Sequence, residues 1–259
     1  MTIRTETADG IARIEIARPE RKNAFTAQMY GAMADALAAA AADPGVRAVV
    51  LHGAPDVFSA GNDIHDFLTR PVVEGNTETV RFMQALMNHE RPVIAAVNGA
   101  AVGIGTTMLM HCDLVYAGDD AKFSMPFVSL GLCPEYASSL LVPLAAGYHK
   151  AAEKLLFGEP ISAEEALEMG IVNRLLPPTE VLEYALRQAR RFCTLPPEAV
   201  RESKRLLKAG WRAAVQQTMA TELESFGRLL TSPESREALN AFLERRKPDF
   251  ARAAAAPAG

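Results

Sequence analysis

One carboxylate in an apolar stretch of this sequence could do proton-transfer chemistry. Glu135 follows Pro134 and precedes the small residues Ala137-Ser138-Ser139, where a helix is expected to begin. An apolar surround would raise the pKa of this carboxyl group and make it a stronger general base near neutral pH. The position equally suits a solvated glutamate that complements a helix dipole from the first turn. The segment alone leaves both interpretations open.

Two glycine-bearing segments could stabilise negative charge through backbone N–H groups. The first is Phe58-Ser59-Ala60-Gly61-Asn62-Asp63, and the second runs from Asn98 to Gly105, each after an expected buried strand. Small residues let the backbone approach a ligand, and a helix start offers free N–H groups. One N–H from each segment could hold a single anionic oxygen, as in an oxyanion hole. Each segment alone is also compatible with an ordinary turn between a strand and a helix.

Other kinds of chemical site find little support. Gly103 and Gly105 lack the third glycine of a dinucleotide fingerprint, because Met108 stands in its place, and no Walker lysine follows. The five histidines share no metal-ligand spacing, and the sequence contains no G-x-S-x-G nucleophile elbow. We therefore expect neither a metal site nor a nucleotide-phosphate cradle.

Composition predicts an ordinary globular protein. Of the 259 residues, 49% are hydrophobic and 22% are charged, and the formal net charge of −4 gives no electrostatic reason to expect a nucleic-acid partner. Three cysteines without a C-x-x-C pair favour reduced thiols in a cytosolic compartment. No signal-peptide pattern opens the chain, and no apolar run reaches the ~18 residues of a membrane span. These features predict a cytoplasmic protein without membrane contact.

Strand and helix signals alternate through most of the chain. Asp9-Gly10 predicts a hairpin turn, and short glycine turns separate the later strand–helix–strand units. This alternation predicts an α/β fold with mostly parallel strands. The expected strands lie at residues 3–7, 11–16, 46–52, 93–97, 114–116 and 171–176, and the expected helices include residues 26–42, 78–88 and 104–111.

The pattern changes near Pro196. Residues 197–247 carry almost no strand signal and three helical stretches, and the closing AAAAPAG is expected to be disordered. We therefore divide the chain into a core of residues 1–195 and a helical C-terminal region of residues 196–259.

Four segments, taken in order, resemble the enoyl-CoA hydratase/isomerase (crotonase) superfamily over nearly the whole chain. Residues 18–24, read as Arg-Pro-Glu-Arg-Lys-Asn-Ala, resemble its CoA-contacting turn, and the two glycine-bearing segments resemble its oxyanion loops. Gly170-Ile171-Val172-Asn173 resembles the segment before its C-terminal helices. The resemblance implies a spiral of ββα turns with an acyl-CoA site in the core. It also implies a C-terminal region that forms a homotrimer, or a hexamer made of two trimers.

The resemblance also assigns roles by position. The oxyanion N–H groups fall on Asn62 and Ile104, and Glu135 matches the catalytic base of the peroxisomal-type Δ3,Δ2-enoyl-CoA isomerases. The two glutamates of the hydratases align with Thr107 and Phe127, neither of which can transfer a proton at neutral pH. The expected substrate- and CoA-binding residues are Arg21, Lys22, Ala24, Ala60, Asp63, Ile64, Phe127, Phe242 and Lys247, the last two of which could act in a neighbouring subunit.

The function that this resemblance implies is isomerisation of a 3-enoyl-CoA to a 2-enoyl-CoA in fatty-acid or related acyl-CoA degradation. Glu135 would carry the proton from C2 to C4, and no cofactor is expected, because coenzyme A is part of the substrate. Hydratase activity is not expected, and Phe127 is further hypothesised to keep water out. Two alternatives stay open. One is isomerisation of a ring-containing or aromatic-pathway acyl-CoA, and the other is acyl-CoA binding without catalysis. The absence of a peroxisomal C-terminal address favours a bacterial, cytoplasmic relative.

Overall fold

The computed structural model describes residues 2–69 and 77–254. Its strands form two sheets, one with the order β1-β2-β3-β5-β7-β10 and the other with the order β4-β6-β8-β9. The strands are β1 (Ile3–Ala8), β2 (Ile11–Ile16), β3 (Ala48–His52), β4 (Val57–Ser59), β5 (Val93–Val97), β6 (Ala100–Val102), β7 (Leu114–Gly118), β8 (Lys122–Ser124), β9 (Ile161–Ser162) and β10 (Arg174–Leu176).

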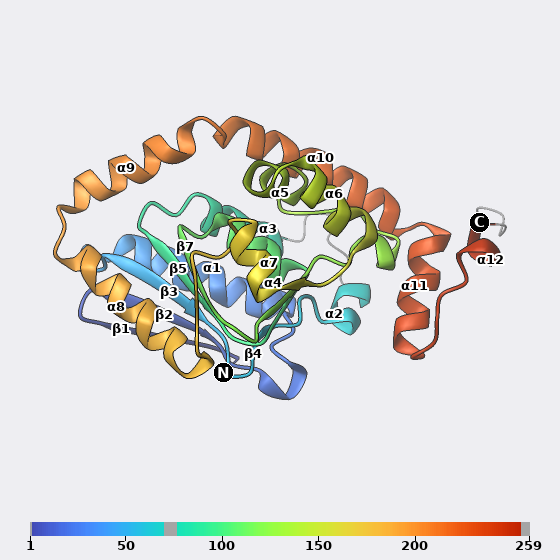
Figure 1. Cartoon of the computed structure of the whole chain (residues 1–259), viewed down its shortest axis with the longest axis horizontal. Coiled ribbons are helices and arrows are strands. Elements are labelled where there is room, and N and C mark those ends of the chain that lie inside the picture. The colour runs from blue at the N-terminus through green and yellow to red at the C-terminus, as the bar shows by residue number, and fades with distance from the viewer. Residues whose placement is uncertain (1, 70–76, 255–259) are drawn as a thin grey trace.

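Helices surround both sheets, as Figure 1 shows. The α-helices are α1 (Ala27–Ala42), α2 (Ile64–Thr69), α3 (Thr77–Met87), α4 (Ile104–Thr107), α5 (Ser138–Ala146), α6 (Tyr148–Phe157), α7 (Ala163–Glu168), α8 (Val181–Cys193), α9 (Pro197–Ala209), α10 (Arg212–Leu230), α11 (Pro233–Leu243) and α12 (Phe250–Ala254). Short 3-10 turns lie at η1 (Pro19–Arg21), η2 (Met108–His111), η3 (Val128–Leu130) and η4 (Pro178–Glu180).

The six-stranded sheet confirms the predicted α/β fold. Its first two strands, β1 and β2, form an antiparallel hairpin. The turn of this hairpin lies at Asp9 and Gly10, which have φ angles of 52° and 76°. The remaining pairs, β2 with β3, β3 with β5, β5 with β7 and β7 with β10, are parallel. Every residue of β3 and β5 is buried, as expected for strands that are covered on both faces.

The four-stranded sheet repeats the same winding beside the first. Successive passes of the chain give one strand to each sheet, first β3 and β4, then β5 and β6, then β7 and β8. The ββα spiral implied by the family resemblance is therefore confirmed. The residue patterns had not indicated β4, β6 and β8 individually, because a strand of three residues is too short to show a hydrophobic period.

An aromatic cluster joins α1 to α3. The rings of Phe25 and Tyr30 lie 5.0 Å apart between centroids, and Phe82 of α3 lies 5.5 Å from Tyr30. All three side chains are buried. Aromatic packing of this kind contributes stability beyond simple burial of apolar area, so it strengthens the contact between α1 and α3.

The boundary predicted near residue 195 falls in the turn between α8 and α9. Beyond it, α9 and α10 run across the core, and α11 and α12 lie at one end of the molecule (Figure 1). The Nζ of Lys204 on α9 lies 2.6 Å from the Asp113 carboxylate and 2.6 Å from the Arg91 carbonyl, which fastens this region to the core. Of the segment expected to be disordered, residues 253 and 254 belong to α12, and residues 255–259 lie outside the described structure.

None of the helices in the described part of the chain combines the length and the hydropathy needed to cross a bilayer.

Gly99 allows β6 to start close to β4, and it provides a test of the spiral. Its φ is +61°, and a Cβ there would lie 1.9 Å from the backbone oxygen of Asp56. Gly99→Ala should therefore lower the free energy of unfolding by about 2 kcal/mol or more. Gly210→Ala is the control, because a Cβ at that position meets nothing within 4 Å. Urea unfolding measures both variants, and equal midpoints for the two would contradict this account of the turn.

Candidate active site

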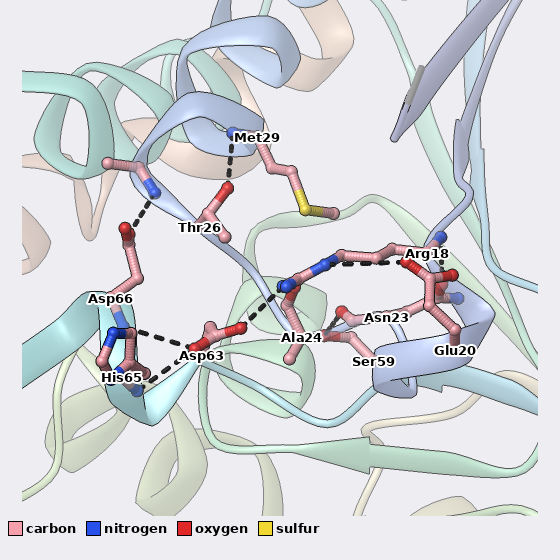
Figure 2. A network of polar contacts seen from close by, with 11 residues as sticks. Arg18, Glu20, Asn23, Ala24, Thr26, Met29, Ser59, Asp63, His65 and Asp66 are labelled. Carbon is pink, nitrogen blue, oxygen red and sulfur yellow. Dashed lines mark hydrogen bonds and ion pairs between the residues drawn. The ribbon is translucent and has the colours of Figure 1, made fainter.

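Polar contacts fasten the N-terminal turn to the first glycine-bearing loop. Figure 2 shows the Arg18 guanidinium reaching the Asp63 carboxylate, and the two groups lie 2.8 Å apart. The buried Asn23 side chain donates to the backbone oxygens of Val57 and Phe58, at 3.1 Å each. Burial alone would raise the pKa of Asp63, but the hydrogen bond and charge of Arg18 hold it below its usual value. Asp63 therefore helps to fix the loop, and its expected contact with the substrate stays a prediction.

The two glycine-bearing loops approach each other too closely for side chains. Gly61 has a φ of +86°, and a Cβ on it would lie 2.7 Å from the Val102 backbone oxygen. A Cβ on Gly105 would lie 2.9 Å from the backbone oxygen of Ser59. Only glycine fits such close backbone contacts without displacement. One residue of each loop, Asn62 and Ile104, lines the same cavity.

Backbone N–H groups from both loops are available at this space. Asn62 and Ile104 both line one cavity of about 220 Å³. Neither N–H makes a hydrogen bond to another group in the described residues. Ile104 begins α4, whose first N–H groups have no partner inside the helix. Because α4 has only four residues, its dipole adds less than a full helix would.

Glu135 is half-buried and lines the same cavity. Burial raises the pKa of its carboxyl group from an ordinary 4.5 to about 8, although a hydrogen bond from Thr107 acts in the opposite direction. That bond runs from the Thr107 hydroxyl to Oε1 of Glu135, at 2.5 Å. The nearby carboxylate of Glu222 raises the pKa further. A carboxyl group with this shift, lining one cavity with Asn62 and Ile104, has the properties of a general base.

Two helices form the walls of this cavity. One is α3, which precedes β5, and the other is α10 from the C-terminal region. The site therefore includes residues beyond the predicted core of residues 1–195. The lining side chains from these helices are Thr79, Val80, Met83 and Gln84 of α3 and Gln216, Met219, Ala220, Leu223 and Phe226 of α10.

The residues expected to bind the acyl chain and coenzyme A are more widely distributed. Phe127 is buried but does not line the cavity, and its ring packs edge-on against Phe226, which does. Arg21 and Lys22 are exposed on the turn after Arg18. Ala24, Ala60 and Ile64 lie in or beside the fastened loops, where the N–H of Ala60 donates to the Lys22 backbone oxygen at 2.9 Å. Their contacts with coenzyme A stay predictions.

Phe242 and Lys247 are exposed in the C-terminal region and do not line the cavity of their own chain. Their expected contribution to a neighbouring subunit also stays a prediction.

Several contacts at the site were not predicted from the sequence. Thr107 was identified only as the residue that replaces a hydratase glutamate, whereas its hydroxyl donates a hydrogen bond to Glu135. The hydroxyl of Tyr30, which donates to Oδ1 of Asn62 at 2.5 Å, was not predicted to lie at the site. The wall formed by α10 was not predicted either. The amphipathic pattern of α10 predicts a buried face, but no local signal indicates that this face meets Glu135 rather than another surface.

A second cavity, of about 390 Å³, lies between α9 and the end of α3 and shares no lining residue with the first. It contains neither glycine loop nor Glu135, so the smaller cavity is the better candidate for catalysis. In the described parts of the chain, no group of three or more His, Cys, Asp or Glu side chains is placed to hold a metal ion.

The raised pKa of Glu135 has a measurable effect on stability. A carboxyl group with a folded-state pKa of about 8 adds stability that is complete below its ordinary pKa of 4.5 and is lost as the pH rises to about 8. Glu135→Gln cannot ionise and does not lose this stability. The free energy of unfolding of the variant, relative to that of wild type, should therefore increase by about 2 to 4 kcal/mol between pH 5 and pH 8.5. Urea unfolding at both pH values measures the difference, with the exposed Glu224→Gln as control. A pH-independent difference would show that Glu135 is not enclosed as described.

The fold has close relatives among solved structures. The structure of Pseudomonas aeruginosa OdaA superposes with a TM-score of 0.92 at 48% sequence identity, covering 94% of this chain and 99% of that one. An enoyl-CoA hydratase/isomerase from Pseudoalteromonas atlantica has a TM-score of 0.91 at 39% identity, covering 96% of this chain and all of that one.

Curated relatives carry both kinds of name. Human enoyl-CoA delta isomerase 2 is 34% identical over 252 residues, covering 95% of this chain and 64% of that protein. A probable enoyl-CoA hydratase of Bacillus subtilis is 32% identical over 236 residues, covering 88% of this chain and 90% of that protein. The enoyl-CoA hydratase/isomerase family profile matches residues 6–253. Together with the ββα spiral and the two glycine loops, this match shows that the chain belongs to the enoyl-CoA hydratase/isomerase family.

Proposed function

We propose that this protein shifts the double bond of a 3-enoyl-CoA into conjugation with the thioester, giving a 2-enoyl-CoA. The observation that supports this most directly is the enclosed carboxyl group of Glu135 in one cavity with the Asn62 and Ile104 N–H groups. An isomerase needs one base to move one proton and donors that hold the enolate oxygen.

The reaction begins with the ionised form of Glu135. Its carboxylate removes a proton from C2, and the electrons of that C–H bond flow onto the thioester oxygen to give a dienolate. The N–H groups of Asn62 and Ile104 stabilise that oxygen, where each such donor typically lowers the barrier by about 3 to 4 kcal/mol. The carboxylic acid then returns the proton at C4, which regenerates the base and completes the shift of the double bond.

The surroundings of Glu135 suit this role. A pKa of about 8 makes its carboxylate a stronger base than an exposed one. Thr107 binds Oε1, which leaves Oε2 to reach the substrate and restricts rotation of the carboxylate. The chemistry needs no cofactor, because coenzyme A enters as part of the substrate and the thioester itself supplies the electron sink.

Hydration is the second candidate, because relatives named hydratases are as similar to the chain as those named isomerases. Adding water requires a group that activates the water and a group that protonates carbon, usually two carboxylates. Within the described residues, Glu135 is the carboxylate that lines the cavity. Thr107 and Phe127, at the positions where the family resemblance places the hydratase glutamates, supply no second one. This contrast favours isomerisation.

The finer features of the proposal concern substrate and assembly. Straight-chain 3-enoyl-CoA is the preferred substrate class, and a ring-containing or aromatic-pathway acyl-CoA is the alternative. A homotrimer, or a dimer of trimers, in the cytoplasm would follow the family resemblance. Exposed apolar side chains on and after α9 support assembly through this region, where Leu206, Leu207 and Trp211 are 59%, 77% and 51% exposed.

The central test is the conversion of 3-hexenoyl-CoA, followed by the absorbance of the conjugated product. Glu135→Gln should reduce kcat by about 10²- to 10⁴-fold, because it removes the base and keeps the shape of the side chain. Glu224→Gln, on the exposed side of α10, should keep the wild-type rate. A Glu135→Gln variant as fast as wild type would refute the proposed role. Substrate binding without turnover by wild type would instead support acyl-CoA binding without catalysis.

The pH profile gives a separate prediction. Because Glu135 acts in its ionised form, kcat/KM should rise with pH through about 8 and then level off. Steady-state rates between pH 6 and pH 10 on 3-hexenoyl-CoA measure this limb. A profile that is flat from pH 6 upward would be incompatible with an enclosed base.

Hydration of 2-hexenoyl-CoA by the wild-type protein distinguishes the two candidate reactions. We expect it to run at least about 100-fold more slowly than isomerisation, since the site offers one proton-transfer group where hydration uses two. Loss of the conjugated absorbance upon addition of enzyme measures it. Comparable rates for both reactions would contradict the assignment as an isomerase.

A further inference from the structure

The chain makes an unusual backbone turn directly after Glu135. Tyr136 and Ala137 both have a φ of 58°, in the left-handed region that non-glycine residues rarely adopt. Two such residues in succession persist only where surrounding contacts hold them. The turn directs Glu135 into the cavity and sends the following residues into α5. We call residues 135–137 the base elbow.

The carbonyl and ring of the base elbow are held by the core. His111 donates from Nε2 to the Tyr136 backbone oxygen at 2.8 Å, and the two rings stack with centroids 3.8 Å apart. The Tyr136 hydroxyl donates to the backbone oxygen of Met83 at 2.8 Å. These contacts fix the middle residue of the elbow but leave the N–H groups at the start of α5.

Those N–H groups are bound from the C-terminal region. Ala137 stands at the N-cap of α5 and has no side-chain oxygen to offer. Glu222 of α10 takes this role, accepting from the Ala137 N–H at 2.5 Å and from the Ser139 N–H at 2.9 Å. Its side chain is 6% exposed. The C-terminal region therefore holds the base elbow through one buried carboxylate, which accepts hydrogen bonds from two backbone N–H groups at the start of α5.

We propose that Glu222 is a positioning residue that holds the base elbow and thereby aims the Glu135 carboxylate at the substrate. The kinetic part of this inference rests on the proposed function. Glu222 touches neither the cavity nor any reacting atom, because the neighbouring α10 residues Ala220 and Leu223 line the wall while Glu222 faces α5. The same helix thus closes the site and orients its base.

Charge also connects Glu222 with Glu135. The titratable groups that face Glu135 in the described residues are Tyr30 of α1, Cys133 and Tyr136 of its own segment, and Glu222 of α10. Burial raises the pKa of both tyrosines and of the cysteine, so these three groups are neutral near pH 8. Burial also raises the pKa of Glu222, while its hydrogen bonds with Ser139 and Ala137 lower it. When ionised, Glu222 raises the pKa of Glu135, in the same direction as burial and against the larger opposite effect of the Thr107 hydrogen bond.

Amide hydrogen exchange tests the holding role without any substrate. In Glu222→Gln, an NH₂ group replaces one of the two acceptor oxygens, and in Glu222→Ala both acceptors are lost. The peptide covering residues 133–141 should therefore exchange faster in both variants than in wild type. Glu224→Gln removes an exposed carboxylate two positions along the same helix and should leave this exchange unchanged. Wild-type exchange in Glu222→Gln and Glu222→Ala would overturn the proposal.

Kinetics test the consequence for catalysis. In Glu222→Gln the limb of kcat/KM that rises with pH should move to lower pH, because a charge that disfavours ionisation of Glu135 is gone. In Glu222→Ala, kcat on 3-hexenoyl-CoA should fall about 10-fold or more with a much smaller change in KM, since a misplaced base lowers reactivity rather than binding. A merely structural role would leave the limb of the folded Glu222→Gln protein in place, and that result would overturn the inference.

The two proposals fail in different ways. A wild-type chain that does not isomerise 3-enoyl-CoA refutes the proposed function. The exchange of residues 133–141 then still decides whether Glu222 holds the elbow, with faster exchange supporting it and unchanged exchange refuting it. With an active wild type, unchanged exchange in the Glu222 variants or an unchanged pH limb in Glu222→Gln refutes only the role of Glu222.

Discussion

The structure depends on a half-buried carboxyl group that protein surrounds closely enough to make its ionisation costly, while the group still lines a cavity. Transfer of an ionised carboxylate into a protein interior is costly, and Glu135 has no salt bridge to a described cation that would offset this cost. Its pKa rises to about 8 as a result. The burial that destabilises the folded protein when Glu135 is ionised also makes the Glu135 carboxylate a stronger base. Stability and basicity at this site are therefore two consequences of one desolvation energy.

A carboxyl group in this environment is useful only if its direction is fixed. Thr107 holds one of its oxygens from the spiral core, and the left-handed turn at Tyr136 sets the path of the backbone that carries it. Glu222 binds the amides beyond that turn from a helix near the end of the chain. The acid group is thus oriented by segments from the middle and the last part of the sequence. The C-terminal helices belong to the site as well as to the expected oligomer.

The glycine loops show how the spiral serves this chemistry. Strands β4 and β6 are parallel neighbours in the second sheet, so their carboxyl ends lie at the same end of that sheet. The loops that follow these two strands therefore lie side by side. Gly61 and Gly105 then allow backbone contacts that a Cβ would prevent. The donors of the proposed oxyanion hole are main-chain N–H groups, so the arrangement does not depend on which acid–base side chains surround it. Proteins named hydratases and proteins named isomerases match this chain at similar identity.

The sequence by itself determined the class of fold, the position of the hairpin, the buried strands β3 and β5 and the two glycine loops, because these depend on local turn chemistry and on hydrophobic patterns of five residues or more. It also singled out Glu135, although the segment alone could not distinguish an enclosed base from a solvated helix-start residue. The family resemblance favoured the base, whereas the burial and raised pKa that suit this role required the tertiary structure, since the pKa of a carboxyl group depends on what surrounds it in space. The short strands of the second sheet, the hydrogen bond from Thr107 and the contact of Glu222 with α5 likewise emerged only from the folded chain. Each of them joins residues that are distant in sequence, and no local pattern records which distant partner a buried face or a polar side chain will meet.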